Sequence, residues 1–153
     1  MEIRDLAQVF PLHPAVDVLA NELSKKYKKH FLLKNLFASA RSIILHAIHN
    51  RLITKQKSST ILIVMDNADD AQYMYADLRT LSQDKDVYFF PASHRRRQKT
   101  DEAMVVQRTE VLSMLIMDKG RSKELMDKGY GEGIIVTYPE ALMEPVPLPE
   151  TLQ

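Results

Sequence analysis

The chain has 153 residues, of which 45% are apolar and 27% are charged, enough for one soluble domain with a buried core. Its 21 Lys and Arg residues are balanced by 20 Asp and Glu residues, which argues against a protein that coats nucleic acid through excess positive charge. The absence of cysteine excludes disulfides, thiolate nucleophiles and cysteine-ligated zinc from this chain.

The N-terminal sequence does not resemble a secretion signal. MEIRDLAQVF carries acidic residues early and has no long apolar core. The sequence also contains no run of about eighteen apolar residues that would suit a membrane span. We therefore expect a soluble, cytoplasmic chain without a membrane partner.

Residues 1–30 are predicted to form an N-terminal helical segment. A short helix is expected over residues 5–10, and Pro14 suits the first turn of a second helix over residues 14–28. Four lysines cluster where this second helix would end, where they suit the negative end of the helix dipole. They are Lys25, Lys26, Lys28 and Lys29. Phosphate binding by this cluster is the alternative.

Residues 31–144 are predicted to form an α/β lobe. Four times, an apolar run is followed by a turn and an amphipathic helix, and continuously apolar runs are typical of strands covered by helices on both faces. The pattern predicts a parallel sheet with right-handed crossovers, flanked by helices. The expected strands are HFLLK (30–34), STILIVMD (59–66), DVYFFPA (86–92) and GIIVTY (133–138), and the expected helices cover 40–52, 67–82, 101–117 and 139–144.

Two segments fall outside this pattern. Residues 118–133 are rich in glycine and charge and are expected to form a surface excursion. Residues 145–153 contain alternating prolines, which cannot continue a helix or a central strand. We expect this second segment to be a linker toward a further domain.

The turn after the first expected strand has the spacing of a phosphate-binding loop. In G-x-x-x-x-G-K-[ST], backbone amides and a lysine hold the phosphates, and here those positions are Asn35, Ala40, Arg41 and Ser42. Asn35 tolerates a left-handed backbone, but Ala40 places a Cβ where phosphate would approach. Arg41 is not equivalent to lysine, and only Ser42 keeps its chemistry. The sequence predicts a degenerate loop without nucleotide or metal; the alternative is an active ATP-binding lobe that uses Arg41 and Ser42.

Two acidic stretches resemble parts of nucleotide enzymes but have a simpler interpretation. Asp66 ends an apolar strand, as a magnesium-holding aspartate would, yet Asp66 or Asn67 as a helix N-cap explains the stretch. The stretch DEA at residues 101–103 resembles a helicase acidic box, but it follows RRRQKT rather than a strand. Thr100 is the expected N-cap there.

The loop HRRRQK, residues 94–99, is the densest positive patch in the sequence. It would lie at the carboxyl ends of the strands, where ligands of such sheets bind. A solvated loop and a contact with phosphates or an acidic partner are both open interpretations. The candidate contact residues are Arg95, Arg96, Arg97 and Lys99.

Catalytic and metal-binding residues are not predicted. His46 and His49 lie three apart in an expected helix, but no third metal ligand is near in sequence, so a helix-face position is favoured. Ser39 and Ser42 have no accompanying His and Asp arrangement that would activate a nucleophile.

Five motifs in a fixed order resemble the N-terminal module of bacterial transcription-repair coupling factor (Mfd). They are L-x-x-L-x-[AG]-S-A-R-[AS]-x-x-L, an ILIV-type strand followed by D-x-A-x-x-x-A-x-D-L, FPA, R-x-E-x-L, and I-I-V-T followed by P-x-A-L-M. In this sequence the motifs cover Leu33 to Leu45, Ile61 to Leu78, Phe90 to Ala92, Arg108 to Leu112, and Ile134 to Met143. The resemblance extends over about residues 5–150.

The resemblance implies the first lobe of a UvrB-like module with a RecA-like fold and a degenerate nucleotide loop. Members of this family are ATP-driven DNA translocases that displace stalled RNA polymerase and recruit excision-repair proteins. The lobe itself would be a non-catalytic scaffold, with ATP and Mg bound by the motor of the parent protein. Its partners would be the following UvrA-binding lobe and the motor, and indirectly UvrA, RNA polymerase and DNA.

The sequence departs from the family pattern at two places. The first loop lacks the glycines usual in the family, and only about ten residues, SHRRRQKTDE, separate the third expected strand from its helix. UvrB has a long aromatic hairpin at the second place, so DNA clamping of that kind is not expected. A fragment of UvrB itself or of another helicase is the remaining alternative.

Overall fold

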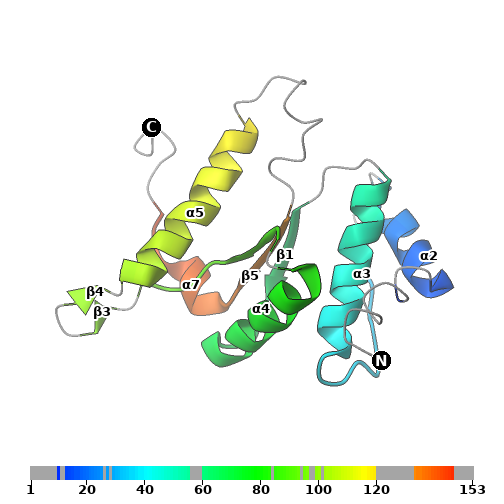
Figure 1. The fold of residues 1–153 in the computed structure, drawn as a ribbon, viewed down its shortest axis with the longest axis horizontal. Coiled ribbons are helices and arrows are strands. Elements are labelled where there is room, and N and C mark those ends of the chain that lie inside the picture. The colour runs from blue at the N-terminus through cyan, green and yellow to red at the C-terminus, as the bar shows by residue number, and fades with distance from the viewer. Residues whose placement is uncertain are drawn as a thin grey trace.

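The computed structural model describes residues 10, 13–25, 27, 29–55, 60–83, 85–93, 95–96, 99–100, 102–119 and 133–146 (Figure 1). Its helices are α2 (Pro14–Leu23), α3 (Ala40–Thr54), α4 (Ala68–Ser82), α5 (Glu102–Lys119) and α7 (Pro139–Met143). Its strands are β1 (Thr60–Val64), β2 (Val87–Phe89), β3 (Arg95–Arg96), β4 (Lys99–Thr100) and β5 (Gly133–Thr137). Within these ranges, no helix has the length and apolarity needed to cross a bilayer.

The main sheet has three parallel strands in the order β1-β5-β2. The central strand β5 is buried along its whole length, whereas exposed and covered residues alternate along the edge strand β1. Helices α4 and α5 each connect one strand to a parallel one, as expected for an α/β protein. The predicted class, a parallel sheet flanked by helices, is therefore confirmed.

Helices pack on both faces of the sheet (Figure 1). On one face, Tyr75 of α4 stacks on Phe89 of β2, with ring centroids 5.2 Å apart. On the other face, α5 packs over β2 and contributes the buried Val111 to the core. Because β5 lies between these two layers, Ile134 and Val136 are completely buried.

The first expected strand is not present, and this prediction was wrong. Residues 31–34 have no regular structure, and Leu32 is 78% exposed. An apolar run becomes a strand only when its backbone groups find a neighbouring ladder, and β1 pairs only with β5 in the described part of the chain. The main sheet described here therefore has three strands instead of four.

Helix α2 ends earlier than predicted. Ser24 caps it by donating from its backbone N–H and its hydroxyl to the Ala20 carbonyl, so the helix stops at Leu23. Lys25 and Lys29 beyond this end both pair with Glu22 and hold the pKa of its carboxyl at about 2. Lys26 and Lys28, the other members of the predicted lysine cluster, lie outside the described residues.

Helix α2 packs against α3 through a second, smaller core. Val16 and Ala20 of α2 meet Ala47, Ile48 and Leu52 of α3. Beside this core, Asp17 binds the side chains of Arg51 and Lys55, whose hydrogen bonds lower the pKa of its carboxyl. Helix α2 is thus attached to the fold through α3, and Ile61 of β1 also packs against this smaller core.

Local capping signals placed α4 correctly. Asn67 is its N-cap, because the Asn67 side chain accepts a hydrogen bond of 2.9 Å from the backbone N–H of Asp70. Thr100, the predicted N-cap of α5, lies in β4, and the helix begins two residues later, at Glu102. Asp101, between them, lies outside the described residues, as do residues 120–132 of the expected surface excursion.

Candidate functional site

The phosphate-loop equivalent is a tight turn before α3. Asn35 has φ 61°, as its predicted tolerance of the left-handed region allowed, and Ala38 has φ 47°. Ser39 occupies the N-cap position of α3, but its side chain makes no capping hydrogen bond. Without glycine, this turn carries a side chain on every residue where a phosphate loop would expose backbone amides.

Replacing Ala38 with glycine is expected to raise the free energy of unfolding by about 0.5–1 kcal/mol. A left-handed backbone costs a non-glycine residue about 1–2 kcal/mol, and the entropy of an unfolded glycine offsets part of that relief. Ala76→Gly, on the exposed side of α4, is the matched control and should destabilise the protein by about 1 kcal/mol. Urea unfolding measures both, and a loss of stability in both variants would contradict this account of Ala38.

Ser42 is buried and takes part in a contact between helices. Only 1% of the residue is exposed, and its Oγ lies 2.9 Å from Asp77 Oδ2 of α4 and 2.9 Å from the Ser39 carbonyl oxygen. The single hydroxyl proton is donated to one of these acceptors at a time. The group that a phosphate loop would direct at magnesium therefore links α3 to α4.

Arg41 is exposed at the border of two adjoining pockets. The larger, about 520 Å³, is mainly apolar, with Phe37 and Met65 in its lining. The smaller, about 270 Å³, is lined by Asp70 and Asp77 as well as Arg41. Two carboxylates beside one guanidinium make this a poor electrostatic environment for a polyphosphate.

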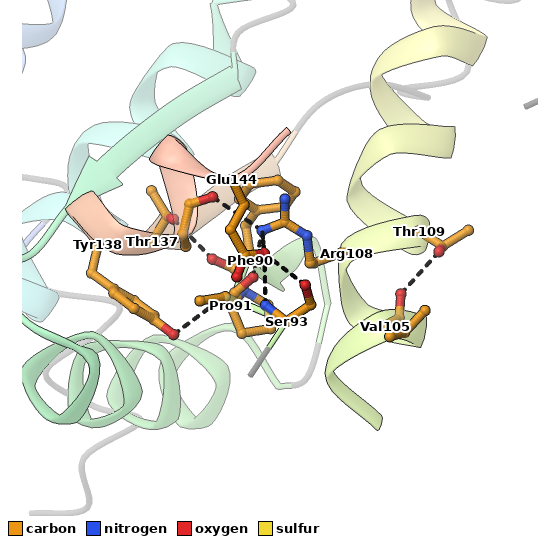
Figure 2. A network of polar contacts seen from close by, with 11 residues as sticks. Phe90, Pro91, Ser93, Val105, Arg108, Thr109, Thr137, Tyr138 and Glu144 are labelled. Carbon is orange, nitrogen blue, oxygen red and sulfur yellow. Dashed lines mark hydrogen bonds and ion pairs between the residues drawn. The ribbon is translucent and has the colours of Figure 1, made fainter. Parts of the chain in front are cut away.

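A second cluster of polar contacts occupies the carboxyl ends of β2 and β5 (Figure 2). Arg108 of α5 is 7% exposed and donates from Nη1 to the Pro91 and Ala141 carbonyl oxygens, at 2.6 and 3.1 Å. Its guanidinium also lies 4.2 Å from the centroid of the Phe90 ring and 3.5 Å from Glu144 Oε2. One arginine thus joins α5 to the segments that follow both strands.

Neighbouring groups complete this cluster (Figure 2). Glu144 Oε2 accepts hydrogen bonds of 2.8 Å from both the backbone N–H and the hydroxyl of Ser93. The Tyr138 hydroxyl accepts from the Ala92 N–H at 2.9 Å, and Thr137 donates to the Phe90 carbonyl at 2.8 Å. The strand ends where such folds usually bind ligands are used here for internal contacts.

Sequence reasoning did not assign these roles to Arg108 and Glu144. The available signal was the set of motifs FPA, R-x-E-x-L and P-x-A-L-M, which stand far apart in the sequence. The structure brings all three together, since Arg108 binds the carbonyl of Pro91 in the first motif and that of Ala141 in the third. In the sequence these motifs carried only a resemblance, whereas in the structure they share the contacts of Arg108 with the Pro91 and Ala141 carbonyls.

The predicted basic loop contains a short antiparallel hairpin. Arg95 pairs with Thr100, and Arg96 pairs with Lys99. Arg97 lies outside the described residues. In Figure 1 the backbone of β3 and β4 lies on the far side of the fold from α3, the helix that carries Arg41.

His46 and His49, the histidine pair of α3, are both buried, at 6% and 4% exposure. Burial lowers the pKa of both imidazoles, and their mutual repulsion lowers that of His49 further, although Asp86 acts in the opposite direction. Among the described residues, no group of three or more His, Cys, Asp or Glu side chains is placed to hold a metal. The pair therefore consists of neutral imidazoles inside the fold at pH 7.

These histidines should make the protein less stable as the pH falls from 7 toward 5. The pKa values of both histidines in the folded protein lie below the unfolded value, so the unfolded chain takes up protons first as the pH falls. The stability that the two neutral imidazoles contribute is complete above about pH 6.5 and is lost as the pH falls through their folded pKa values. Urea unfolding at each pH should show a smaller slope in His46→Gln and His49→Gln, but not in the exposed control His30→Gln. Glu22, whose carboxyl has a pKa of about 2, affects the pH dependence of stability only at lower pH. An unchanged slope in both variants would contradict the assignment.

The fold and these contacts define a helix-flanked α/β lobe with a three-stranded parallel sheet, in which groups at the usual ligand end contact one another. Comparison of the chain with protein-family models, curated proteins and solved structures finds no match.

Proposed function

We propose that this chain is a non-catalytic, RecA-like scaffold and regulatory lobe of an ATP-driven DNA translocase that couples transcription to repair. The observation that carries the non-catalytic part is the position of Ser42, whose hydroxyl is buried against Asp77. The carboxylates of Asp70 and Asp77 beside Arg41 support the same conclusion, because they oppose the binding of a polyphosphate. ATP and Mg would then be bound by the motor of the parent protein.

The assignment to a translocase is supported by the five ordered motifs, three of which meet at Arg108. In this proposal the lobe packs against a following UvrA-binding lobe and against the motor, and it restrains the parent protein until RNA polymerase is engaged. Contact would be made by the hairpin and its turn, through Arg95, Arg96, Arg97 and Lys99. UvrA, RNA polymerase and DNA would be affected indirectly.

Titration with Mg-ATP tests the non-catalytic part. A nucleotide that binds only the folded state at 100 times its Kd raises the free energy of unfolding by about 2.7 kcal/mol. We expect no saturable rise in Tm for the wild-type chain. A saturable rise that Arg41→Gln abolishes would instead establish an active nucleotide-binding lobe.

Charge reversal tests the regulatory part. Arg95→Glu, Arg96→Glu and Arg97→Glu, combined in the full-length parent protein, should change its basal ATPase rate or its affinity for UvrA. The matched control reverses Lys34, an exposed basic residue on the α3 side of the fold. If neither quantity changes in the triple variant, the hairpin is not the contact.

A further inference from the structure

A groove lies at the surface between the turn at residues 33–39, α3, the end of β1 and α4. It consists of the two adjoining pockets beside Arg41, a mainly apolar one of about 520 Å³ and a smaller one of about 270 Å³. Met65 and Met74 line both pockets, so the two form one continuous groove. Because methionine side chains are unbranched and polarisable, this lining can adapt to apolar groups of different shapes.

Large apolar side chains are exposed around the groove. Phe37 and Leu33 line its larger part and are 77% and 46% exposed, and Tyr73 lines its smaller part and is 75% exposed. Exposed aromatic residues gathered around a hollow are typical anchors of protein interfaces. A pocket for a small molecule usually encloses most of its ligand, whereas these side chains are open to solvent. The groove therefore suits a segment of a protein chain.

The smaller part of the groove is acidic. Asp70, Tyr73 and Asp77 are three and four residues apart, so α4 places all three on one face, and all three line this part. Asp70 accepts a hydrogen bond from Asn67 and Asp77 accepts one from Ser42, but in the described part of the chain neither carboxylate forms an ion pair. A cation that enters here meets two carboxylates and an exposed aromatic ring, and both attract it.

We propose that this groove binds a segment of a partner protein in which a large apolar side chain lies next to a lysine or arginine. The apolar side chain occupies the larger part, against Phe37, and the cationic group occupies the smaller part, near Asp70, Tyr73 and Asp77. An acidic segment would be repelled by the two carboxylates, of which Arg41 offsets only one. A wholly apolar segment would remove them from water without a counter-charge, which is unfavourable. The proposal does not depend on the role of the lobe in a translocase.

Selection from random peptides displayed on phage tests the chemistry of the occupant without assuming its sequence. The immobilised wild-type chain is the target, and peptides that bind the support alone are removed. We expect the enriched peptides to share a large apolar residue beside a lysine or arginine. A synthetic copy of one such peptide should bind less tightly when its basic residue is replaced with glutamate and when the salt concentration is raised. Failure to enrich any peptide, or enrichment of acidic or uncharged peptides, would overturn the proposal.

Surface variants show whether the selected peptide occupies the groove. By fluorescence anisotropy, Phe37→Ala should weaken its binding about fivefold or more, and Asp70→Asn about two- to fivefold. The matched controls are Val106→Ala on α5, where the residue is 65% exposed, and Glu140→Gln on α7, where the residue is also exposed. Both controls should leave the affinity unchanged.

All four substituted residues are exposed, so the variants should fold, and circular dichroism checks this. Affinity that neither Phe37→Ala nor Asp70→Asn alters would place the peptide elsewhere and overturn the proposal. Sedimentation of the wild-type chain covers the remaining occupant. A dimer that Phe37→Ala dissociates would assign the groove to a second copy of the chain and would also overturn the proposal.

Discussion

Replacing Arg108 with methionine is expected to lower the free energy of unfolding by about 3 kcal/mol. Methionine keeps the apolar bulk over Phe90 but leaves the buried carbonyls of Pro91 and Ala141 without the Arg108 donor. It also removes the guanidinium from Glu144, which keeps its hydrogen bonds from Ser93. Removing one partner of a largely buried ion pair costs about 3–5 kcal/mol, and the partial exposure of Glu144 places this case at the lower end. Urea unfolding followed by circular dichroism measures the loss.

The matched control is Arg79→Met, because the exposed Arg79 also lies over an aromatic ring, 5.6 Å from the centroid of Tyr75. It should cost no more than about 1 kcal/mol. A double-mutant cycle with Glu144→Gln then separates the ion pair from the two carbonyl contacts. Equal losses in Arg108→Met and Arg79→Met would show that the cluster in Figure 2 does not stabilise the fold.

Replacing Leu78 with alanine should have an effect at least as large, about 3–5 kcal/mol. Leu78 belongs to the face of α4 that packs on the sheet, and none of its surface is exposed. The loss combines the transfer energy of the removed methyl groups with the cavity that they leave. Leu32→Ala is the matched control, since Leu32 is 78% exposed and should change stability by less than about 0.5 kcal/mol. Similar losses in the two variants would contradict the described packing of α4.

The elements that sequence predicted well are those with local causes. Helix α4 was expected over residues 67–82 and is observed at Ala68–Ser82, because its N-cap, first-turn acids and apolar period all lie within the segment. The run at residues 30–34 was misassigned because strand formation depends on a pairing partner elsewhere in the chain. The apolar character of a segment does not specify whether such a partner exists.

The candidate site shows the same difference between features with local causes and features that depend on residues far away in the sequence. The left-handed Asn35 could be anticipated from its own residue type. The burial of Ser42 could not be anticipated, because its partner Asp77 is 35 positions away. The contacts of Arg108 could not be anticipated either, because the two carbonyls that it binds are 17 and 33 positions away. Whether the loop around Arg41 binds nucleotide stays a prediction.

Glu144 connects two parts of the chain that are far apart in the sequence. Its carboxylate holds Ser93, 51 positions earlier and just before the basic hairpin, while its own backbone leads directly into Pro145. Displacement of the Glu144 carboxylate would therefore remove two hydrogen bonds that hold Ser93, the last described residue before the hairpin.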